Sequence, residues 1–276
     1  MDLAEAQRSF YENQLNYREE VIDKSKKICF VFFSGHGVFR PYTISGFTKM
    51  IVRDDYYEWQ NVARSPYIKK KAGLILFIRD IYMQFYVEGI NRNINSVDAL
   101  VEFVKSKTKG YDVICCGSSA GGYIAALVGS KIHCRFVLSK SGQFSLYSWG
   151  GVERKPLLKK HLDEKRYNRY YDIVSLIKKS KVPIFYFYAY MNEHDLQQYN
   201  EISRCGNVFC FAFQSDEHAV TCRGEDFPLI LSKDVRTLKK LCRKCKGKVL
   251  SQTGFEVKLM GVHGFLWQKF YSLFRF

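Results

Sequence analysis

The chain has 276 residues, of which 47% are hydrophobic, so it is long enough to bury one large core. Its formal net charge of +16 favours an anionic partner: nucleic acid, an anionic membrane surface, an acidic polysaccharide or a phosphorylated donor. The first 20 residues lack the apolar core of a secretory signal, and no apolar run is long enough to predict a membrane-spanning helix.

The nine cysteines are an odd number scattered through apolar segments such as Cys115-Cys116. Buried thiols in a reducing compartment explain this distribution better than a disulfide framework, so we expect a cytoplasmic protein. Cys242 and Cys245 have the spacing of zinc ligands, but no second pair accompanies them at a suitable distance. We therefore expect two thiols in a basic helix and no bound metal.

Residues 1–26 are polar with interspersed apolar side chains, and we expect a helical extension that rests on the body. Residues 27–33 form an apolar, aromatic run that predicts an interior strand, and it ends in the flexible loop of residues 34–37. In that loop, the backbone N–H groups of Gly35 and His36 are candidate donors to a developing oxyanion. A loop histidine that caps a backbone group is the alternative for His36.

Two further segments lead to the centre of the chain. Residues 73–78 predict a second buried strand, and the apolar spacing of residues 97–104 predicts a helix that begins after Asn95-Ser96. Residues 38–72, which precede both segments, are irregular, aromatic and charged. They could hold a substrate or simply pack on the sheet.

The stretch from residue 111 to residue 130 reads as strand, sharp turn and helix. The apolar residues 113–115 stop at Gly117-Ser118-Ser119-Ala120-Gly121, and small residues at helical spacing follow. The Gly-x-Ser-x-Gly spacing is typical of a nucleophile elbow, in which Ser119 is lifted above the sheet and the N–H of Ala120 faces a developing negative charge. A phosphate-binding turn or a merely structural turn is the alternative.

Residues 143–180 form a basic, aromatic insertion between predicted strands at residues 136–138 and 182–190. We interpret it as a cap over an active site, with two solvated surface helices as the alternative. A last strand is predicted at residues 208–213. The alternation of strands and helices predicts a single α/β domain over residues 1–276, with a mostly parallel sheet and helices on both faces.

The loops after the last two strands supply the partners that a serine nucleophile needs. Asp195 follows the strand of residues 182–190, and His218 follows the strand of residues 208–213. Since parallel strands bring their carboxyl-terminal loops together, both should approach Ser119, in the chain order Ser, acid, His. Glu193 is the alternative acid, and Asp216 is too close to His218 in sequence to orient it easily. His194 is the alternative base.

The segment of residues 241–276 is basic and aromatic. It could lie in a membrane interface, anchored by its aromatic side chains and attracted by its cations, or pack on the body as a last helix.

The Gly117-to-Gly121 turn, the loop of residues 34–37, Asp195 and His218 together resemble the alpha/beta-hydrolase superfamily over about residues 27–240. The GSSxGG form of the elbow and the Asn-Glu-His-Asp acid loop look more like the bacterial capsule O-acetyltransferases and esterases of this fold than like secreted lipases. The resemblance implies an acyl-serine intermediate on Ser119 and transfer of an acetyl group from acetyl-CoA to a surface-polysaccharide sugar.

From these observations we expect a serine-dependent acyl-ester enzyme that acts on a carbohydrate by O-acetyl transfer or deacetylation. No permanently bound cofactor is expected, and acetyl-CoA is the candidate co-substrate. The alternative is a non-catalytic module that binds an acidic glycan or a membrane surface. Peripheral contact at the inner face of the membrane fits the carboxyl-terminal segment. No recognised motif supports nucleic acid as the partner.

Overall fold

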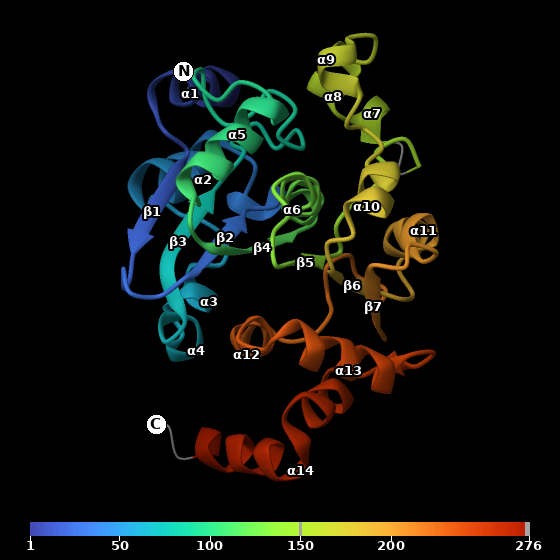
Figure 1. The fold of residues 1–276 in the computed structure, drawn as a ribbon. Coiled ribbons are helices and arrows are strands. Elements are labelled where there is room, and N and C mark those ends of the chain that lie inside the picture. Colours follow the sequence, from blue (N-terminus) through green and yellow to red (C-terminus); the bar gives the residue numbers. More distant parts are fainter. Residues whose placement is uncertain (149–150, 274–276) are drawn as a thin grey trace.

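The computed structural model describes residues 1–148 and 151–273, so Trp149 and Gly150 of the insertion and residues 274–276 lie outside the described residues. In the described part of the chain, eight strands form one sheet in the order β1-β3-β2-β4-β5-β6-β7-β8 (Figure 1). Neighbouring strands are parallel except for β1, which pairs antiparallel with β3. The predicted α/β architecture with a mostly parallel sheet is confirmed.

The strands are β1 (Tyr17–Val21), β2 (Ile28–Phe33), β3 (Ala72–Ile78), β4 (Asp112–Ser118), β5 (Phe136–Lys140), β6 (Ile184–Ala189), β7 (Val208–Phe213) and β8 (Val249–Leu250). The longer helices are α1 (Leu3–Asn13), α5 (Val97–Lys107), α6 (Ala120–Lys131), α11 (Glu193–Ile202), α13 (Val235–Cys245) and α14 (Gln252–Leu273). The shorter helices are α2 (Ile44–Phe47), α3 (Gln60–Arg64), α4 (Pro66–Lys69), α7 (Gly151–Arg154), α8 (Pro156–Lys160), α9 (Lys165–Asn168), α10 (Val174–Ser180) and α12 (Phe227–Leu231). Single turns of other helix types are His36–Val38, Thr48–Arg53 and Gly224–Asp226.

Helices cover both faces of the sheet, α5, α6 and α10 on one side and α3, α4, α12 and α13 on the other (Figure 1). Strand β2 shows why its sequence is apolar throughout. Val31 and Phe33 belong to the core under α6, whereas Phe30 and Phe32 belong to the core on the opposite face. All four side chains are fully buried, and each contributes about 1.5–3 kcal/mol to folding by its removal from water. A strand covered on both faces therefore has no polar alternation.

The amino-terminal segment contains a strand in addition to the predicted helix. Strand β1 continues the sheet beyond β3, with Tyr17 opposite Ile78 and Val21 opposite Leu74. Its sequence, YREEV, is charged, because one side of an edge strand faces water, so the pattern does not stand out from the polar residues around it. The prediction of a purely helical extension for residues 1–26 was therefore incomplete.

The insertion folds into the short helices α7 to α10. It packs on the body through buried side chains such as Leu158 and Ile177, and its cations pair with acids of the body. Lys160 lies 3.1 Å from Glu88, and Arg169 pairs with Asp98. The described part of the insertion is thus attached to the body, and its function as a cap stays a prediction.

The carboxyl-terminal helix α14 has two halves with different surroundings. Before Gly261 it packs on the sheet, where Phe255 is fully buried among the rings of Phe211 and Phe213. Gly261 has φ 76° and ψ 163°, a backbone conformation that favours glycine, and the helix bends there. Beyond it the large side chains include exposed ones such as Trp267. The first half of this segment therefore packs on the body, which was one of the two alternatives, and contact with a membrane interface stays a prediction.

None of the helices in the described ranges combines the length and the apolar character that crossing a bilayer requires. The cysteines are free thiols within these ranges, and Cys242 and Cys245 both lie in the basic helix α13, as expected, where their side chains are buried.

A buried polar cluster joins the start of α12 to α14. Arg223 donates from Nη1 to Oε1 of Glu256 at 2.6 Å, and the backbone N–H of Arg223 donates to Oδ2 of Asp226 at 3.1 Å. Burial, together with the negative charge of Glu256, raises the pKa of Asp226 to about 6. The folded protein therefore holds a proton on Asp226 that the unfolded chain releases near pH 3.9.

Replacement of Asp226 by Asn tests this assignment. Because the pKa is raised in the folded state, wild type should lose stability relative to Asp226→Asn as the pH rises from about 4 to 7. After allowance for solvent screening we expect a change on the order of 1 kcal/mol. The measurement is urea unfolding of both proteins at several pH values, and parallel stability curves would contradict the assignment.

Candidate active site

The turn between β4 and α6 holds Ser119 with φ 54° and ψ −120°, a combination that is rare for a residue with a side chain. The two flanking glycines make this turn possible. A Cβ added to Gly117 would lie 2.1 Å from the carbonyl oxygen of Gly121, and one added to Gly121 would lie 2.3 Å from the carbonyl oxygen of Phe33. The Gly-x-Ser-x-Gly spacing thus reflects the close approach of three backbone segments.

Backbone hydrogen bonds fix the turn on both sides. The N–H of Ser119 donates to the carbonyl of Lys140 at 2.8 Å, and the N–H of Tyr123 donates to the carbonyl of Ser119 at 3.0 Å. Ser118, the last residue of β4, is buried, whereas Ser119 is half-buried at the start of α6. The turn therefore presents the hydroxyl of Ser119, rather than that of Ser118, at the edge of the sheet.

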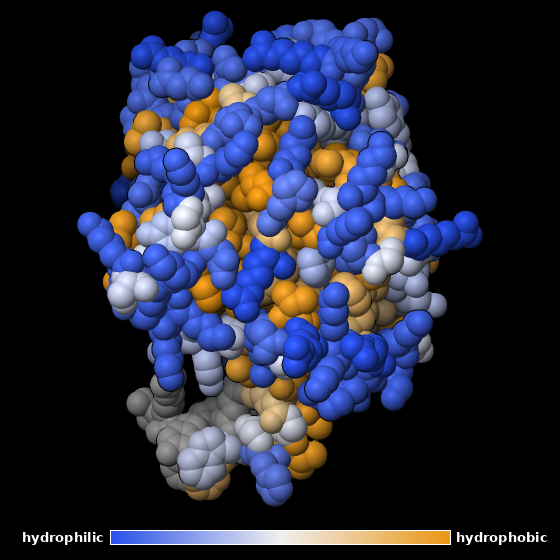
Figure 2. All heavy atoms as spheres, viewed as in Figure 1, coloured by the Kyte–Doolittle hydropathy of each residue, from blue (hydrophilic) through white to orange (hydrophobic). Residues whose placement is uncertain are grey.

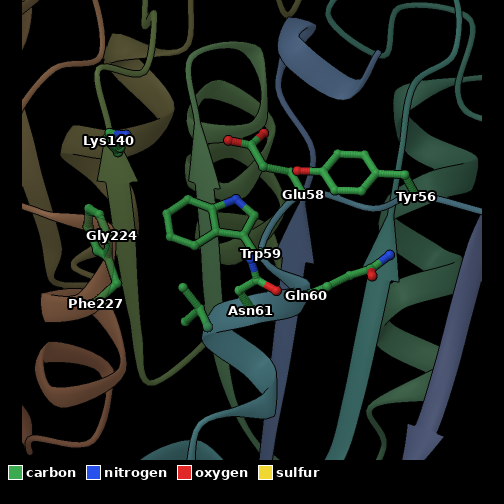
Figure 3. A pocket seen from close by; sticks show the side chains of 9 residues that line it. Tyr56, Glu58, Trp59, Gln60, Asn61, Lys140, Gly224 and Phe227 are labelled. Atoms are coloured by element: carbon green, nitrogen blue, oxygen red, sulfur yellow. The ribbon is translucent and has the colours of Figure 1, made fainter. Parts of the chain in front are cut away.

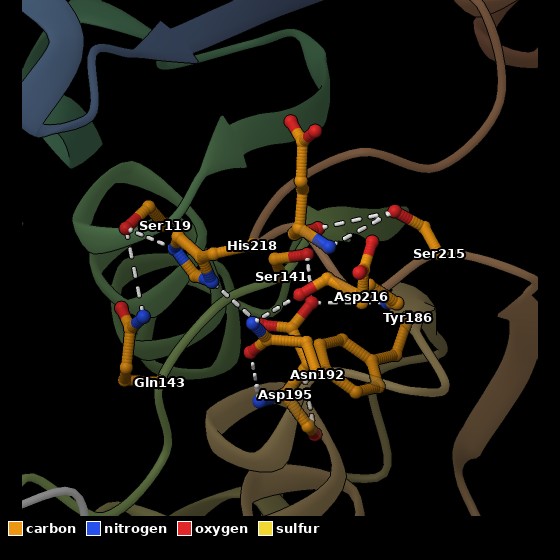
Figure 4. Close-up of polar contacts among 11 residues, drawn as sticks. Ser119, Ser141, Gln143, Tyr186, Asn192, Asp195, Ser215, Asp216 and His218 are labelled. Carbon is orange, nitrogen blue, oxygen red and sulfur yellow. Dashed lines mark hydrogen bonds and ion pairs between the residues drawn. The ribbon is translucent and has the colours of Figure 1, made fainter.

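The three residues predicted as a triad form a continuous chain of hydrogen bonds (Figure 4). The hydroxyl of Ser119 lies 2.9 Å from Nε2 of His218, and Nδ1 of His218 lies 2.6 Å from Oδ1 of Asp195. These residues follow β4, β7 and β6, respectively, whose carboxyl ends meet at one edge of the sheet. With the ring proton on Nδ1, the imidazole donates to the carboxylate and accepts the serine proton at Nε2.

Asp195 is held more firmly than its neighbours in the acid loop. Its side chain is 1% exposed, and Oδ2 accepts hydrogen bonds from the hydroxyl of Ser141 at 2.5 Å and the N–H of Ala189 at 3.0 Å. Both carboxylate oxygens are therefore occupied by donors, which keeps the group oriented towards His218. Glu193, the alternative acid, is exposed on the first turn of α11.

A hydrogen bond joins the acid loop to the histidine loop. Asn192 caps α11 by accepting from the N–H of Asp195 at 3.1 Å, and its Nδ2 donates to the carbonyl of Asp216 at 2.9 Å. Asp216 thus contacts the acid loop through its backbone. This contact, together with the hydrogen bond from the N–H of Met191 to the carbonyl of Ser215, holds the two loops against each other.

The candidate oxyanion donors are in different situations. Ala120 is the first residue of α6, where backbone N–H groups have no partner within the helix. The N–H of Gly35 donates to Oε2 of Glu58 at 2.6 Å, so Gly35 is already engaged and its predicted role is not supported by this contact. Ala120 and His36 are left as candidate donors.

The side chain of His36 is buried beside the candidate triad. Its Nε2 atom is buried and has no hydrogen-bond partner within the part of the chain that the structure describes. The ring meets Phe85 edge-on, with centroids 4.6 Å apart. Burial, with the nearby positive charge of Lys155, lowers the pKa of His36 well below its usual value. A neutral imidazole therefore lies beside the candidate triad.

Three residues near the site were not predicted from the sequence. Ser141 holds Asp195, Gln143 has its Nε2 at 3.5 Å from the hydroxyl of Ser119, and Glu58 holds Gly35. Ser141 directly follows β5 and Gln143 comes two residues later, so the rule that points to polar residues after parallel strands could have found them. Glu58 lies in the irregular stretch before α3, where no sequence pattern marks it.

A pocket of about 170 Å³ lies beside Glu58 (Figure 3). Lys140, at the end of β5, and the ring of Phe227 line it together with Glu58 and Trp59. Trp59 has φ 78°, and its Nε1 atom is buried without a partner among the described residues. Burial raises the pKa of Glu58, and the hydrogen bond from Gly35 opposes that shift. Two residues that line the pocket also contact the active-site loops. Glu58 accepts a hydrogen bond from the N–H of Gly35, and the carbonyl of Lys140 accepts one from the N–H of Ser119.

Comparison with solved structures identifies the architecture, while no protein-family model matches the sequence and no curated protein shows significant similarity to it. A mutant of the capsule O-acetyltransferase of Neisseria meningitidis serogroup A, in complex with CoA, is 12% identical, with 83% of this chain and 93% of that chain covered and a TM-score of 0.50. An alpha/beta hydrolase enzyme from the metagenome of sediments from the lagoon of Mar Chica, Morocco, is 16% identical, with 78% and 91% covered and a TM-score of 0.46. MenH from S. aureus is 11% identical, with 79% and 97% covered and a TM-score of 0.45. By its architecture, this chain has the alpha/beta-hydrolase fold.

Proposed function

We propose that this protein is a serine-dependent acyl-ester enzyme acting on a carbohydrate, and that it transfers an O-acetyl group or removes one. The hydrogen-bonded series from Ser119 through His218 to Asp195 carries the proposal. A serine hydroxyl is a weak nucleophile unless a base accepts its proton. Here the base, its orienting carboxylate and a serine in a strained turn occur together at one sheet edge.

In the first half-reaction, Ser119 Oγ attacks the carbonyl carbon of the acyl donor while its proton passes to Nε2 of His218. The negative charge on the former carbonyl oxygen is then stabilised by the N–H groups of Ala120 and His36. The carboxylate of Asp195 stabilises the imidazolium through Nδ1. As the intermediate collapses, the bond to the leaving group breaks, His218 returns the proton to that group, and the acyl group remains on Ser119.

In the second half-reaction, a hydroxyl of the acceptor attacks the acyl carbon and gives its proton to His218, which returns it to Ser119 Oγ. A sugar hydroxyl as acceptor gives O-acetyl transfer, and water gives hydrolysis. The two reactions use the same catalytic groups, so the acceptor that the site admits decides between them. The insertion of residues 143–180 would shape that choice as a cap.

The proposed donor and acceptor rest on other observations. The net charge of +16 suits a phosphorylated donor or an anionic glycan. The sequence resembles the bacterial capsule O-acetyltransferases in its elbow and acid loop, and a capsule O-acetyltransferase with similar architecture was solved with CoA. We therefore propose acetyl-CoA as co-substrate and a bacterial surface-polysaccharide sugar as acceptor.

Covalent labelling tests the nucleophile. A fluorophosphonate probe should modify Ser119, as located by mass spectrometry of the labelled peptide. Ser119→Ala should abolish labelling, and His218→Ala should slow it by about 10³-fold, because the base is lost. Ser118→Ala, at the buried neighbouring serine, is the matched control and should label at close to the wild-type rate. Labelling that survives Ser119→Ala at the same rate would exclude the assignment.

The acceptor is tested by incubating the protein with an activated acetyl ester or acetyl-CoA, with and without an oligosaccharide. Transfer predicts an acetylated sugar and donor turnover that rises with sugar concentration. Hydrolysis predicts free acetate at a rate that the sugar leaves unchanged. Both should disappear in Ser119→Ala. Salt-sensitive glycan binding without any turnover, unaffected by that substitution, would instead support a non-catalytic binding module.

Glu58 should affect catalysis by holding the loop of residues 34–37 in place. Glu58→Ala removes the acceptor for the N–H of Gly35 and should lower kcat by about tenfold, because the neighbouring oxyanion donor loses its fixed position. Glu58→Gln keeps an acceptor oxygen and should retain most of the wild-type kcat. Steady-state kinetics of the acetyl-ester reaction make the comparison, with thermal unfolding as the control for folding. An equal loss in both variants, or a change in KM alone, would contradict this role.

A further inference from the structure

A cluster of lysines lies between α13 and α14. Lys233, Lys240 and Lys244 meet Lys258 of α14 around a groove of about 200 Å³, and we call these four residues the lysine groove. No ion pair to any of them is found within residues 1–148 and 151–273. Four neighbouring ammonium groups repel one another, so the groove favours a partner with several negative charges.

A line of apolar side chains follows on the second half of α14. Val262, Leu266 and Phe270 are spaced four residues apart, which places them on one side of a helix, and Trp267 is adjacent to Leu266. We call these four residues the apolar stripe. Their exposed fractions are 59%, 58%, 56% and 64%, respectively. Apolar side chains gathered in this way on a surface usually mark a site of interaction.

The lysine groove and the apolar stripe adjoin each other along the chain and at one end of the molecule. Lys258 precedes Val262 by one helical turn, with the bend at Gly261 between them. Helices α13 and α14 lie together beyond one face of the sheet, and the second half of α14 extends away from the body (Figure 1). Apolar atoms reach the surface of this projecting end in Figure 2.

We propose that the lysine groove and the apolar stripe together dock this protein on the surface of a bilayer that contains anionic lipids. The second half of α14 lies in the plane of the interface, with the apolar stripe among the upper acyl chains. The lysine groove faces the headgroup phosphates. This docking is independent of the acyl chemistry proposed above.

The lysine groove and the apolar stripe together favour a bilayer over other partners. A second copy of the chain on this face would bring two lysine grooves together, which opposes association. A soluble polyanion would pair with the lysines but would leave the apolar stripe in water. An anionic bilayer satisfies both, because apolar burial and electrostatic attraction add up at its interface.

The experiment is co-sedimentation of the full chain with vesicles of phosphatidylcholine, with and without phosphatidylglycerol. Wild type should bind the anionic vesicles and bind phosphatidylcholine alone at least tenfold more weakly. Lys240→Gln/Lys244→Gln/Lys258→Gln should lower the partition coefficient on anionic vesicles by about 10–100-fold. Leu266→Ser/Trp267→Ser/Phe270→Ser should lower it at least tenfold, and circular dichroism checks that both variants remain folded.

A matched control comes from a second basic pocket, in which Lys239, on another side of α13 from the lysine groove, joins Lys178 and Lys181 at the end of α10. Lys178→Gln/Lys181→Gln/Lys239→Gln changes the net charge by the same amount and should alter binding less than twofold. An equal loss in the control and in the lysine-groove variant would overturn the proposal, since only overall charge would then matter. Wild type that dimerises without lipid, and becomes monomeric in the apolar-stripe variant, would also overturn it.

Discussion

The backbone of Ser119 occupies a conformation that costs on the order of 1–3 kcal/mol for a residue with a side chain, and its surroundings keep it there. Helix α6 is buried from Ala120 to Ser130, so it cannot shift to relax the turn. Gly121 brings α6 against the end of β2, and Gly117 brings β4 against α6. The position of the Ser119 hydroxyl at the sheet edge therefore depends on one of the best-packed parts of the molecule.

The arrangement of loops in a parallel sheet explains why the candidate site could be predicted from one sequence. In a parallel sheet every strand delivers its following loop to the same edge, so Asp195 and His218 reach Ser119 although they are distant from it along the chain. The apolar runs that mark such strands are unambiguous when both faces of the sheet are covered. The elbow is equally visible, because its glycines are required by contacts within the backbone.

Other features leave no such mark in the sequence. Strand β1 is charged and forms because β3 offers it hydrogen-bonding partners, a fact of tertiary structure. Glu58 reaches Gly35 from a segment without regular structure, and its carboxylate takes up an amide that the sequence assigned to the oxyanion. Helix α14 is packed on the sheet before Gly261 and exposes large side chains after it, because the helix bends at this residue. Each of these depends on distances between segments that composition and periodicity do not encode.

The two edge strands of the sheet are charged or short, unlike the strands in its interior. This difference affects whether two molecules can pair through their sheet edges. On one margin, β1 presents Arg18, Glu19 and Glu20 along a five-residue strand, and on the other, β8 is two residues long. An unpaired edge of a sheet can recruit a strand from another molecule, and charge and shortness both discourage this. The long apolar strands β2, β4 and β6 are enclosed between these margins. The folded protein is thereby protected from edge-to-edge aggregation despite the strongly apolar strands in its core.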